Sequence, residues 1–105
     1  MEVIADRQLT LRKDGGHVDV TVKIGKPELD ASGENWMCRY EIWFGGSCTS
    51  MAMHGVDSMQ ALQLAIATLD VELEVGARKY AGTLYHYDEP FTSMLENSGL
   101  EVRRT

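Results

Sequence analysis

The amino-acid sequence predicts an α+β fold, in which an antiparallel meander sheet of four to five strands carries one long amphipathic helix packed on one face. Residues 1–54 alternate polar and apolar side chains in runs separated by glycine turns, which is the pattern of β-strands. Residues 57–75 instead repeat apolar side chains every three or four positions, as a helix with one buried side does. Residues 76–105 follow neither period and predict an irregular C-terminal arm. A chain of 105 residues has room for one such domain.

The first predicted hairpin joins two strands at residues 8–12 and 17–24. Both strands alternate apolar and polar side chains, most regularly in the second, so one face of each should be buried. Between them, the sequence KDGG of Lys13–Gly16 contains glycines that can adopt the positive φ angles of a tight turn. Pro27 ends the second strand because it lacks a backbone donor, and the polar residues 28–35 predict a surface loop.

A second predicted hairpin joins strands at residues 36–44 and 48–53 through the turn Gly45–Gly46. The face of its first strand that suits a core carries Trp36, Cys38, Tyr40, Ile42 and Phe44. On the other face, Trp43 is a large apolar side chain that needs an explanation. Either a partial second layer covers it, or it packs on a neighbouring strand, or it is displayed for a partner.

One helix is predicted over residues 57–75. Asp57 is a suitable N-cap, and Gln60, three residues later, completes a capping box in which both side chains bond backbone amides at the helix start. Gly76 is expected to end the helix in the left-handed conformation that glycine adopts without strain. The stripe that we expect to cover the sheet consists of Met59, Leu62, Ile66, Leu69 and Leu73, with Ala65 at its flank.

The sequence GVDSMQALQLAI at residues 55–66 is similar to the site at which acyl carrier proteins bear phosphopantetheine on a serine, here Ser58. That interpretation requires a small helical bundle with another helix upstream. The upstream residues are patterned as strands, so a bundle would contradict most of the front half of the chain. We therefore predict that Asp57 caps the helix and that Ser58 is only its first residue.

The C-terminal arm is rich in large side chains. Thr83–Tyr87 predicts either a fifth strand or an extended segment. Five large residues gather around it, where they could wrap the edge of the domain or form a partner-binding surface: Tyr85, Tyr87, Phe91, Met94 and Leu95. Residues 101–105 have no evident anchor, and we expect them to fray.

Sixteen acidic residues against ten lysines and arginines give the chain a formal charge of −6. This charge repels nucleic-acid backbones and anionic membrane surfaces, so we expect neither as a partner. The same charge either keeps the protein soluble or complements a basic protein partner. No segment is apolar enough to span a bilayer, and the N-terminus lacks the features of a secretory signal, so we expect a cytoplasmic protein.

Cys38 and Cys48 fall on neighbouring predicted strands at positions that are not directly opposite, so we expect free thiols. The three histidines, His17, His54 and His86, show no zinc-ligand spacing. The sequence therefore predicts neither a metal nor a cofactor, and no catalytic set of residues stands out.

Three blocks of sequence follow the order of four strands and a helix: GGHVDVTVKIGKP, WMCRYEI and GVDSMQALQLAI. In this arrangement, residues 4–75 resemble a family of small bacterial proteins defined only as a domain of unknown function. The resemblance implies the fold and a bacterial setting. It implies no activity and no site residues, because the family has no assigned catalytic residues.

The first functional hypothesis is a non-enzymatic protein-binding module, such as an acidic immunity or accessory protein that blocks a basic effector. Its candidate contact residues are Trp43, Tyr85, Tyr87 and Phe91, because tight interfaces depend on aromatic anchors and complementary charge.

The second hypothesis is a small-ligand or anion-binding protein, or an enzyme, that uses the helix N-terminus. There the backbone amides near Asp57 and Ser58 would hold an anion while His54 exchanges a proton. The third is a homo-oligomeric structural protein, such as a homodimer, formed through an unpaired edge of the sheet.

Overall fold

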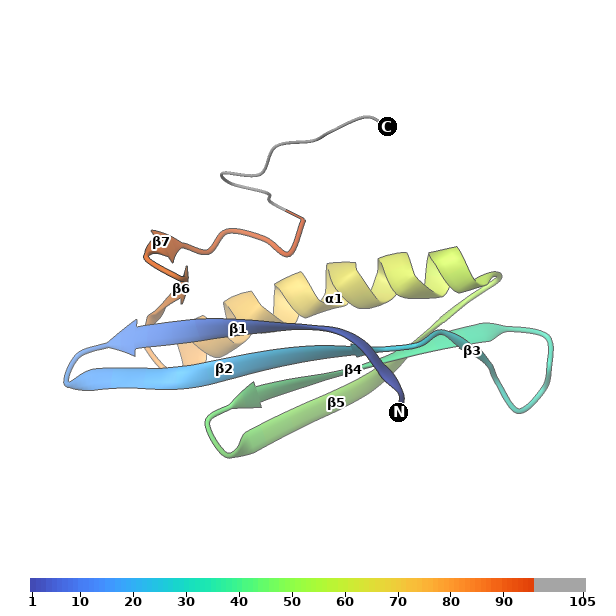
Figure 1. The fold of residues 1–105 in the computed structure, drawn as a ribbon, viewed down its shortest axis with the longest axis horizontal. Coiled ribbons are helices and arrows are strands. Elements are labelled where there is room, and N and C mark those ends of the chain that lie inside the picture. Colours follow the sequence, from blue (N-terminus) through green and yellow to red (C-terminus); the bar gives the residue numbers. More distant parts are fainter. Residues whose placement is uncertain (96–105) are drawn as a thin grey trace.

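The computed structural model describes residues 1–95 and confirms the α+β fold class, because one helix packs on one face of an antiparallel sheet (Figure 1). The strands are β1 (Val3–Lys13), β2 (Gly16–Gly25), β3 (Glu28–Leu29), β4 (Trp36–Phe44), β5 (Ser47–Gly55), β6 (Thr83–His86) and β7 (Glu89–Pro90). The helix, α1, spans Ser58–Lys79.

The long strands follow one another across the sheet in the order β1, β2, β4 and β5, which is the predicted meander. The chain then crosses over the sheet and adds β6 beside β1, with Leu84 opposite Leu11. Thr83–Tyr87 is therefore a strand up to His86. The sheet has seven strands rather than four to five, because β3 and β7 are two-residue pairings too short to show a period in the sequence.

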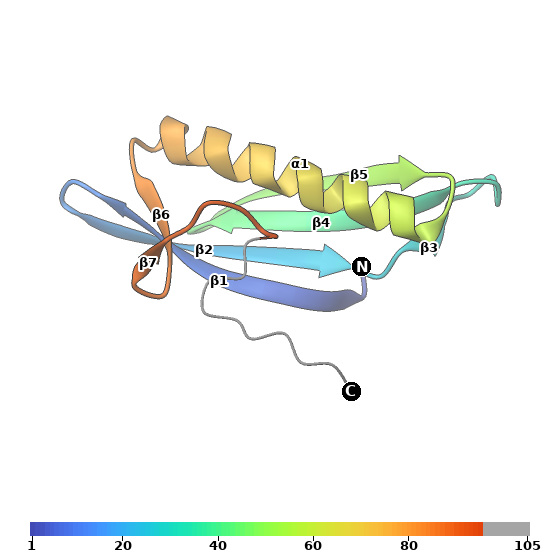
Figure 2. The same ribbon diagram turned by 90° about the horizontal axis from the view of Figure 1, so that it is seen from above.

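The core lies between α1 and the sheet. Its buried residues are Leu9, Leu11, Val20, Val22, Ile24, Cys38, Tyr40, Ile42, Ala61, Ala65, Leu69, Leu73 and Leu84. Viewed from above, α1 runs over β4 and β5, and residues 91–95 lie between α1 and β1 (Figure 2). Phe91 and Met94 pack there against the core. The Met94 amide donates to Asp70 Oδ1 at 2.7 Å, which ties this segment to the helix.

Two expectations about the helix were wrong. Its buried residues are Ala61, Ala65, Leu69, Leu73 and Gly76, while Met59 is 62% exposed. The small side chains Ala61 and Ala65 bring the helix close to the sheet, so the buried stripe is rotated from the one predicted by residue size. Gly76 does not end the helix but lies within it. A side chain at this position would collide with the ring of Phe44, so glycine is needed there for close packing.

The helix ends three residues later, at Lys79, with Tyr80 as its C-cap. Ala81 adopts the left-handed conformation, with φ of 52°, that was expected of Gly76. The amide of Gly82 then donates to the carbonyl of Ala77 at 2.9 Å, which completes a Schellman motif. The predicted arm of residues 76–105 thus begins as helix and continues as β6 and β7, and the fraying expected at 101–105 concerns residues outside the described part of the chain.

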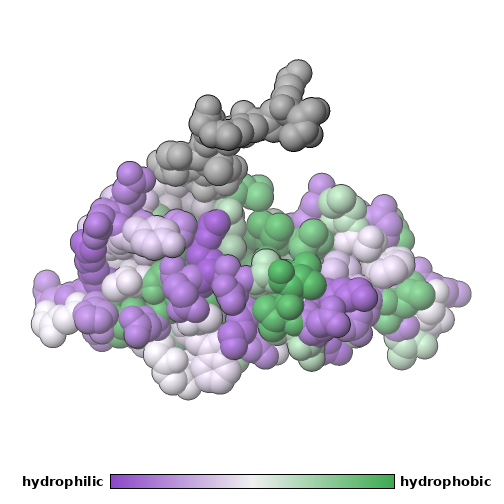
Figure 3. Space-filling view, in the orientation of Figure 1, coloured by the Kyte–Doolittle hydropathy of each residue, from purple (hydrophilic) through white to green (hydrophobic). Residues whose placement is uncertain are grey.

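The two edges of the sheet differ. At the β1 edge, β6 pairs with Thr10–Arg12, and the register of β1 shifts between Val3 and Ala5. The side of the molecule drawn in Figure 3 carries a hydrophobic area near its middle, and β1 leaves both Val3 and Ile4 exposed. At the other edge, β5 pairs with β4 alone among residues 1–95. No helix among residues 1–95 is long and apolar enough to cross a membrane.

Candidate functional site

One end of the molecule is built by three separate parts of the chain. Leu29 in β3 pairs with Trp36 in β4, and Trp36 also pairs with Gly55 at the end of β5. The amide of Lys26 donates to the carbonyl of Glu2 at 2.7 Å, which brings the N-terminus to the same end. Helix α1 begins here as well, because Gly55 lies so close to the helix that a Cβ on it would sit 2.5 Å from the amide nitrogen of Ala61.

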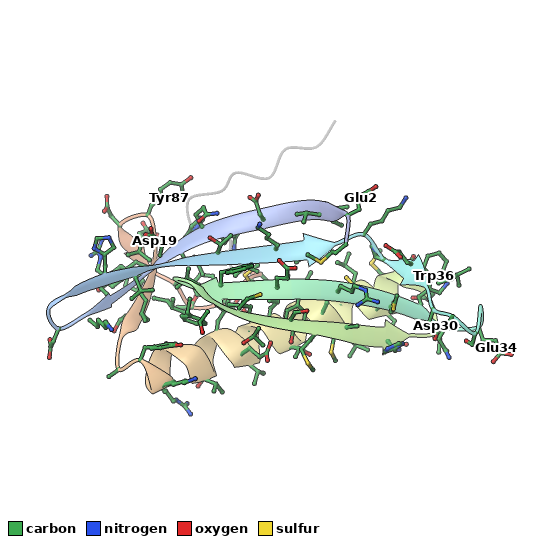
Figure 4. The ribbon with its side chains drawn as sticks, turned by 90° about the horizontal axis from the view of Figure 1, so that it is seen from below. Glu2, Asp19, Asp30, Glu34, Trp36 and Tyr87 are labelled. Atoms are coloured by element: carbon green, nitrogen blue, oxygen red, sulfur yellow. The ribbon has the colours of Figure 1, made fainter. Side chains whose placement is uncertain are left out.

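This end, which we call the acidic end, gathers negative charge. Its carboxylates are Glu2, Glu28, Asp30, Glu34 and Asp57, and the lysine among these segments is Lys26. Figure 4 shows Asp30 and Glu34 at the tip of this end and Glu2 in the same half of the molecule, farther in beside β1, whereas Tyr87 lies in the opposite half. The formal charge of −6 is therefore spread unevenly over the molecule.

Apolar side chains are exposed beside these carboxylates. Leu29 in β3 is 50% exposed, and Val56 and Met59 at the start of α1 are 73% and 62% exposed. Trp36 is half-buried and packs with one side against the core. Exposed apolar side chains among charges of one sign are typical of a protein-binding surface.

Asp30 organises the loop within the acidic end. Its Oδ1 accepts the amide of Ser32 at 3.0 Å, and its Oδ2 lies 3.8 Å from Nδ1 of His54. Hydrogen bonding from Ser32 is the main reason that the pKa of Asp30 is lowered, and a protonated His54 adds to this effect. The carboxylate of Asp30 therefore stays negative on this surface at neutral pH.

The three residues of the hypothetical anion site do lie near one another, but their interactions do not favour an anion. Asp57 Oδ1 accepts the Gln60 amide at 2.7 Å, and Gln60 Oε1 accepts the Val56 amide at 2.7 Å. The helix start is thus capped by a carboxylate of its own, and Ser58 is the first helical residue. With His54 directed at Asp30, a bound anion would face two negative side chains.

The aromatic candidates lie in three different settings. Trp43 and Tyr85 lie on the face of the sheet that α1 leaves uncovered, where Trp43 pairs with Thr21 and with Cys48. The indole of Trp43 donates to Glu41 Oε1 at 3.1 Å. The ring of Tyr85 stacks under the guanidinium of Arg12, 3.9 Å from the ring centre. Trp43 is therefore a half-buried side chain on the uncovered face, with Thr21 and Cys48 as its neighbours on the adjoining strands.

Tyr87 and Phe91 differ from each other in exposure. Tyr87 lies in the turn between β6 and β7, is 86% exposed and has a positive φ of 57°. Phe91 is half-buried and packs against the core on the helix side of the sheet. The four aromatic residues therefore do not form one surface.

The uncovered face of the sheet is nearly balanced in charge. Its acidic residues are Asp6, Asp19, Glu28 and Glu41, and its basic residues are Arg12, Lys23 and Arg39. Lys23 lies between Asp6 and Glu41 on neighbouring strands, an arrangement that cross-strand attraction stabilises. This face does not account for the net negative charge.

Cys38 is buried and Cys48 is exposed, and both are free thiols, as predicted. Burial raises the pKa of Cys38, which makes it less reactive than an ordinary thiol. Among residues 1–95, no three His, Cys, Asp or Glu side chains are grouped so that they could hold a metal ion.

Of the acidic end, the sequence pattern predicts a role for Asp57 but not for the other carboxylates. One signal was available, since the segment 28–35 carries three carboxylates in eight residues. That these carboxylates meet Glu2 and Asp57 depends on the pairing of β3 with β4, which has no local signature in the sequence.

A family model described as a domain of unknown function, DUF6968, matches residues 5–94. The match includes β6 and β7, which the resemblance over residues 4–75 did not cover. Searches of curated proteins and of solved structures found no match for the chain.

Proposed function

The chain belongs to DUF6968, a family defined as a domain of unknown function, and we propose that it is a non-enzymatic protein-binding module for a basic partner. The observation that carries this proposal is the acidic end, where carboxylates lie beside exposed apolar side chains. An acidic immunity or accessory protein that covers a basic surface of its target is the form of this function that we favour. The proposed setting is the cytoplasm, where both thiols would remain reduced.

The two properties of the acidic end have separate roles in such binding. The carboxylates attract a basic surface over several ångströms, which raises the rate of encounter and excludes acidic partners. The exposed side chains of Leu29, Val56 and Met59 would then be removed from water, which supplies most of the binding free energy. Hydrogen bonds from Ser32 lower the pKa of Asp30, so its carboxylate keeps its charge further into the acidic range than an ordinary aspartate does.

The alternative of an anion-binding protein or enzyme has less support. Asp57 occupies the helix N-terminus, and Asp30 is the neighbour of His54. General acid–base catalysis requires a histidine that can reach a substrate together with a second positioned group. Here the second group is a carboxylate that would repel an anionic substrate.

The test is to isolate the tagged chain gently from its own host and to identify the bound protein and its stoichiometry by native mass spectrometry. The test variant carries Glu28→Lys and Glu34→Lys at the acidic end. The matched control carries Glu74→Lys and Asp88→Lys, which change the charge equally at exposed positions in the C-terminal half of α1 and in the β6–β7 turn.

We expect a basic protein to be bound stoichiometrically by the parent and by the control, to be lost from the test variant and to dissociate as salt is raised. An acidic or neutral partner, or one retained equally by both variants, would contradict the proposal. If Trp43→Ala abolished binding of the partner and the charge changes did not, binding would instead be assigned to the uncovered face of the sheet.

A further inference from the structure

The outer edge of β5 lacks the features that normally protect an edge strand. Its nine residues pair with β4 in one uninterrupted register from Trp36–Gly55 to Phe44–Ser47, without a bulge. The sequence SCTSMAMHG contains no proline, lysine, arginine or carboxylate. Natural edge strands are usually kept apart by such residues or by a bulge. The β1 edge, in contrast, has an irregular register near Ala5 and is partly covered by β6.

A second apolar stripe runs along α1 beside this edge. Its residues, Leu64, Thr68, Val71 and Val75, are four, three and four positions apart and so share one side of the helix. Val71 and Val75 are 59% and 56% exposed. The Thr68 hydroxyl donates to the Leu64 carbonyl at 2.8 Å, so it needs no other partner. This stripe takes no part in the buried core.

One end of the stripe, Val75, borders the same groove as the edge strand, whereas Val71 lines a groove on the other flank of α1, beside Leu84 and Phe91. Val75 and Glu72 of the helix line the first groove from one side, and Ser47 and Thr49 of β5 line it from the other. Met51, which is exposed, lies on the same face of β5 as Thr49, two residues along. The molecule thus presents free backbone hydrogen-bonding groups and an apolar surface side by side.

We propose that two copies of the chain pair through β5, antiparallel about a two-fold axis near Met51, to form one continuous sheet. In that arrangement each copy of Thr49 lies opposite Met53 of the other copy, and Met51 lies opposite itself. Such an interface is self-complementary, which is the commonest way in which soluble proteins form dimers. No side chain of like charge is opposed along β5, because the strand carries none.

The position of the helix agrees with this arrangement. Helix α1 contacts both β4 and β5 and crosses them obliquely, so that its C-terminal half lies towards the outer side of β5 (Figure 2). A second copy paired along β5 would bring its own α1 alongside on the same face of the joined sheet. The outer flanks of the two helices would therefore meet over the seam.

Charge supports a second copy as the occupant. The start of β5 lies near the C-terminal end of α1, and its end lies near the helix start. An antiparallel seam therefore brings Arg78 and Lys79 of one copy to the end at which Asp57 of the other copy begins its helix. Opposite charges meet there. Glu28 and Leu29 lie on β3, which is separated from β5 by β4, so this part of the acidic end stays accessible in the dimer, whereas Asp57 lies at the seam.

The test measures the mass of the full chain by sedimentation velocity over a range of concentrations. We expect twice the chain mass of 11.7 kDa at micromolar concentrations. Met51→Lys would place two like charges at the axis, and Val75→Glu would place a charge on the side of α1 that borders β5, so each should shift the midpoint of dimerisation at least tenfold to higher concentration. Both positions are exposed in one copy, so folding should be unaffected.

Two matched controls make the same changes away from the seam. Ile4→Lys alters an exposed apolar residue on the β1 edge, and Gln63→Glu alters an exposed residue on another side of α1. Both should dimerise as the parent does. A monomer throughout the concentration range would overturn the proposal, and so would a dimer weakened by Ile4→Lys but not by Met51→Lys.

A second measurement tests the axis directly. In a chain with Cys48→Ser and Met51→Cys, mild oxidation should give a disulfide-linked dimer, because residue 51 faces itself across the seam. Cys48 alone, in the parent, should not cross-link, since it would lie opposite His54. If the parent and the variant with Cys48→Ser and Met51→Cys cross-linked equally, the proposed register would be overturned. Neither measurement involves a basic partner, so they stand apart from the test of the proposed function.

Discussion

The hydroxyl of Tyr40 donates a hydrogen bond to the carboxylate of Glu72, which joins the centre of β4 to the middle of α1. Tyr40 is fully buried apart from this contact. Burial is the main cause that raises the pKa of Tyr40 well above its usual value, and the hydrogen bond and the negative charge of Glu72 raise it further. The folded state therefore strongly favours the neutral phenol.

The raised pKa of Tyr40 predicts how the free energy of unfolding changes with pH in the alkaline range. Because the pKa of Tyr40 is higher in the folded than in the unfolded chain, the contribution is fully present below about pH 10 and is lost as pH rises above it. Tyr40→Phe should lower the free energy of unfolding by about 1 kcal/mol at neutral pH and make its fall above about pH 10 less steep. Urea unfolding over this pH range measures both effects.

Tyr87→Phe is the matched control, because it removes a phenol that is exposed in a turn. It should leave the pH dependence unchanged. If Tyr40→Phe and the parent lost stability equally steeply above about pH 10, the buried phenol would not be the group responsible.

Gly76→Ala should destabilise the protein although alanine favours helices. A Cβ at this position would lie 2.3 Å from Cζ of Phe44, so the ring would have to move. We expect a loss of about 1–3 kcal/mol from overpacking, against a gain of about 1 kcal/mol in helix propensity. In a Phe44→Ala background the clash is absent, and the same change should be neutral or stabilising. Thermal or urea unfolding of the parent, the two single variants and the double variant gives the coupling free energy between Gly76 and Phe44.

Gly76 also shows where sequence-based prediction of this fold reached its limit. The alternation in β2 and β4 reveals their buried faces, because each strand has one face towards α1 and one without a covering layer. The contact of Gly76 with Phe44 joins residues far apart in the chain, and no local pattern marks it. For the same reason, residue size alone assigned Met59 to the buried stripe of α1, which in fact includes Ala61 and Ala65.

Prediction of the candidate site from the sequence was limited in a similar way. The negative charge and the cap at Asp57 are visible in the sequence. The meeting of Glu2, Glu28 and Asp57 at one end follows from the pairing of β3 with β4 and from the Lys26–Glu2 hydrogen bond. Both are contacts between segments whose sequences show no period, so only the fold brings them together.

Ala81→Gly should stabilise the protein. Ala81 holds a φ of 52° at the end of α1, a conformation that strains every residue with a Cβ. Glycine removes this strain, and after its greater entropy in the unfolded chain is subtracted, a gain of about 0.5–1 kcal/mol remains. Thermal unfolding should show a higher midpoint.

The neighbouring change Gly82→Ala is the contrasting control, because a Cβ there would lie 2.8 Å from the carbonyl oxygen of Arg12 and from Cγ of Leu11. It should destabilise the junction between α1 and β1. If Ala81→Gly and Gly82→Ala changed the free energy of unfolding in the same direction, backbone strain at Ala81 and close packing at Gly82 would not be the right explanations.

Asp57→Ala should destabilise the start of α1 by about 1 kcal/mol, because it removes the acceptor of the Gln60 amide. Asp57→Asn keeps an acceptor oxygen at the same place and should cost much less, whereas Gln60→Ala should cost an intermediate amount, since only the bond to the Val56 amide is lost. Hydrogen exchange of the first-turn amides, measured beside urea unfolding, separates a local effect at the cap from a global one. Equal losses for Asp57→Ala and Asp57→Asn would show that the charge of Asp57 near the helix dipole, and not its hydrogen bond, stabilises this end.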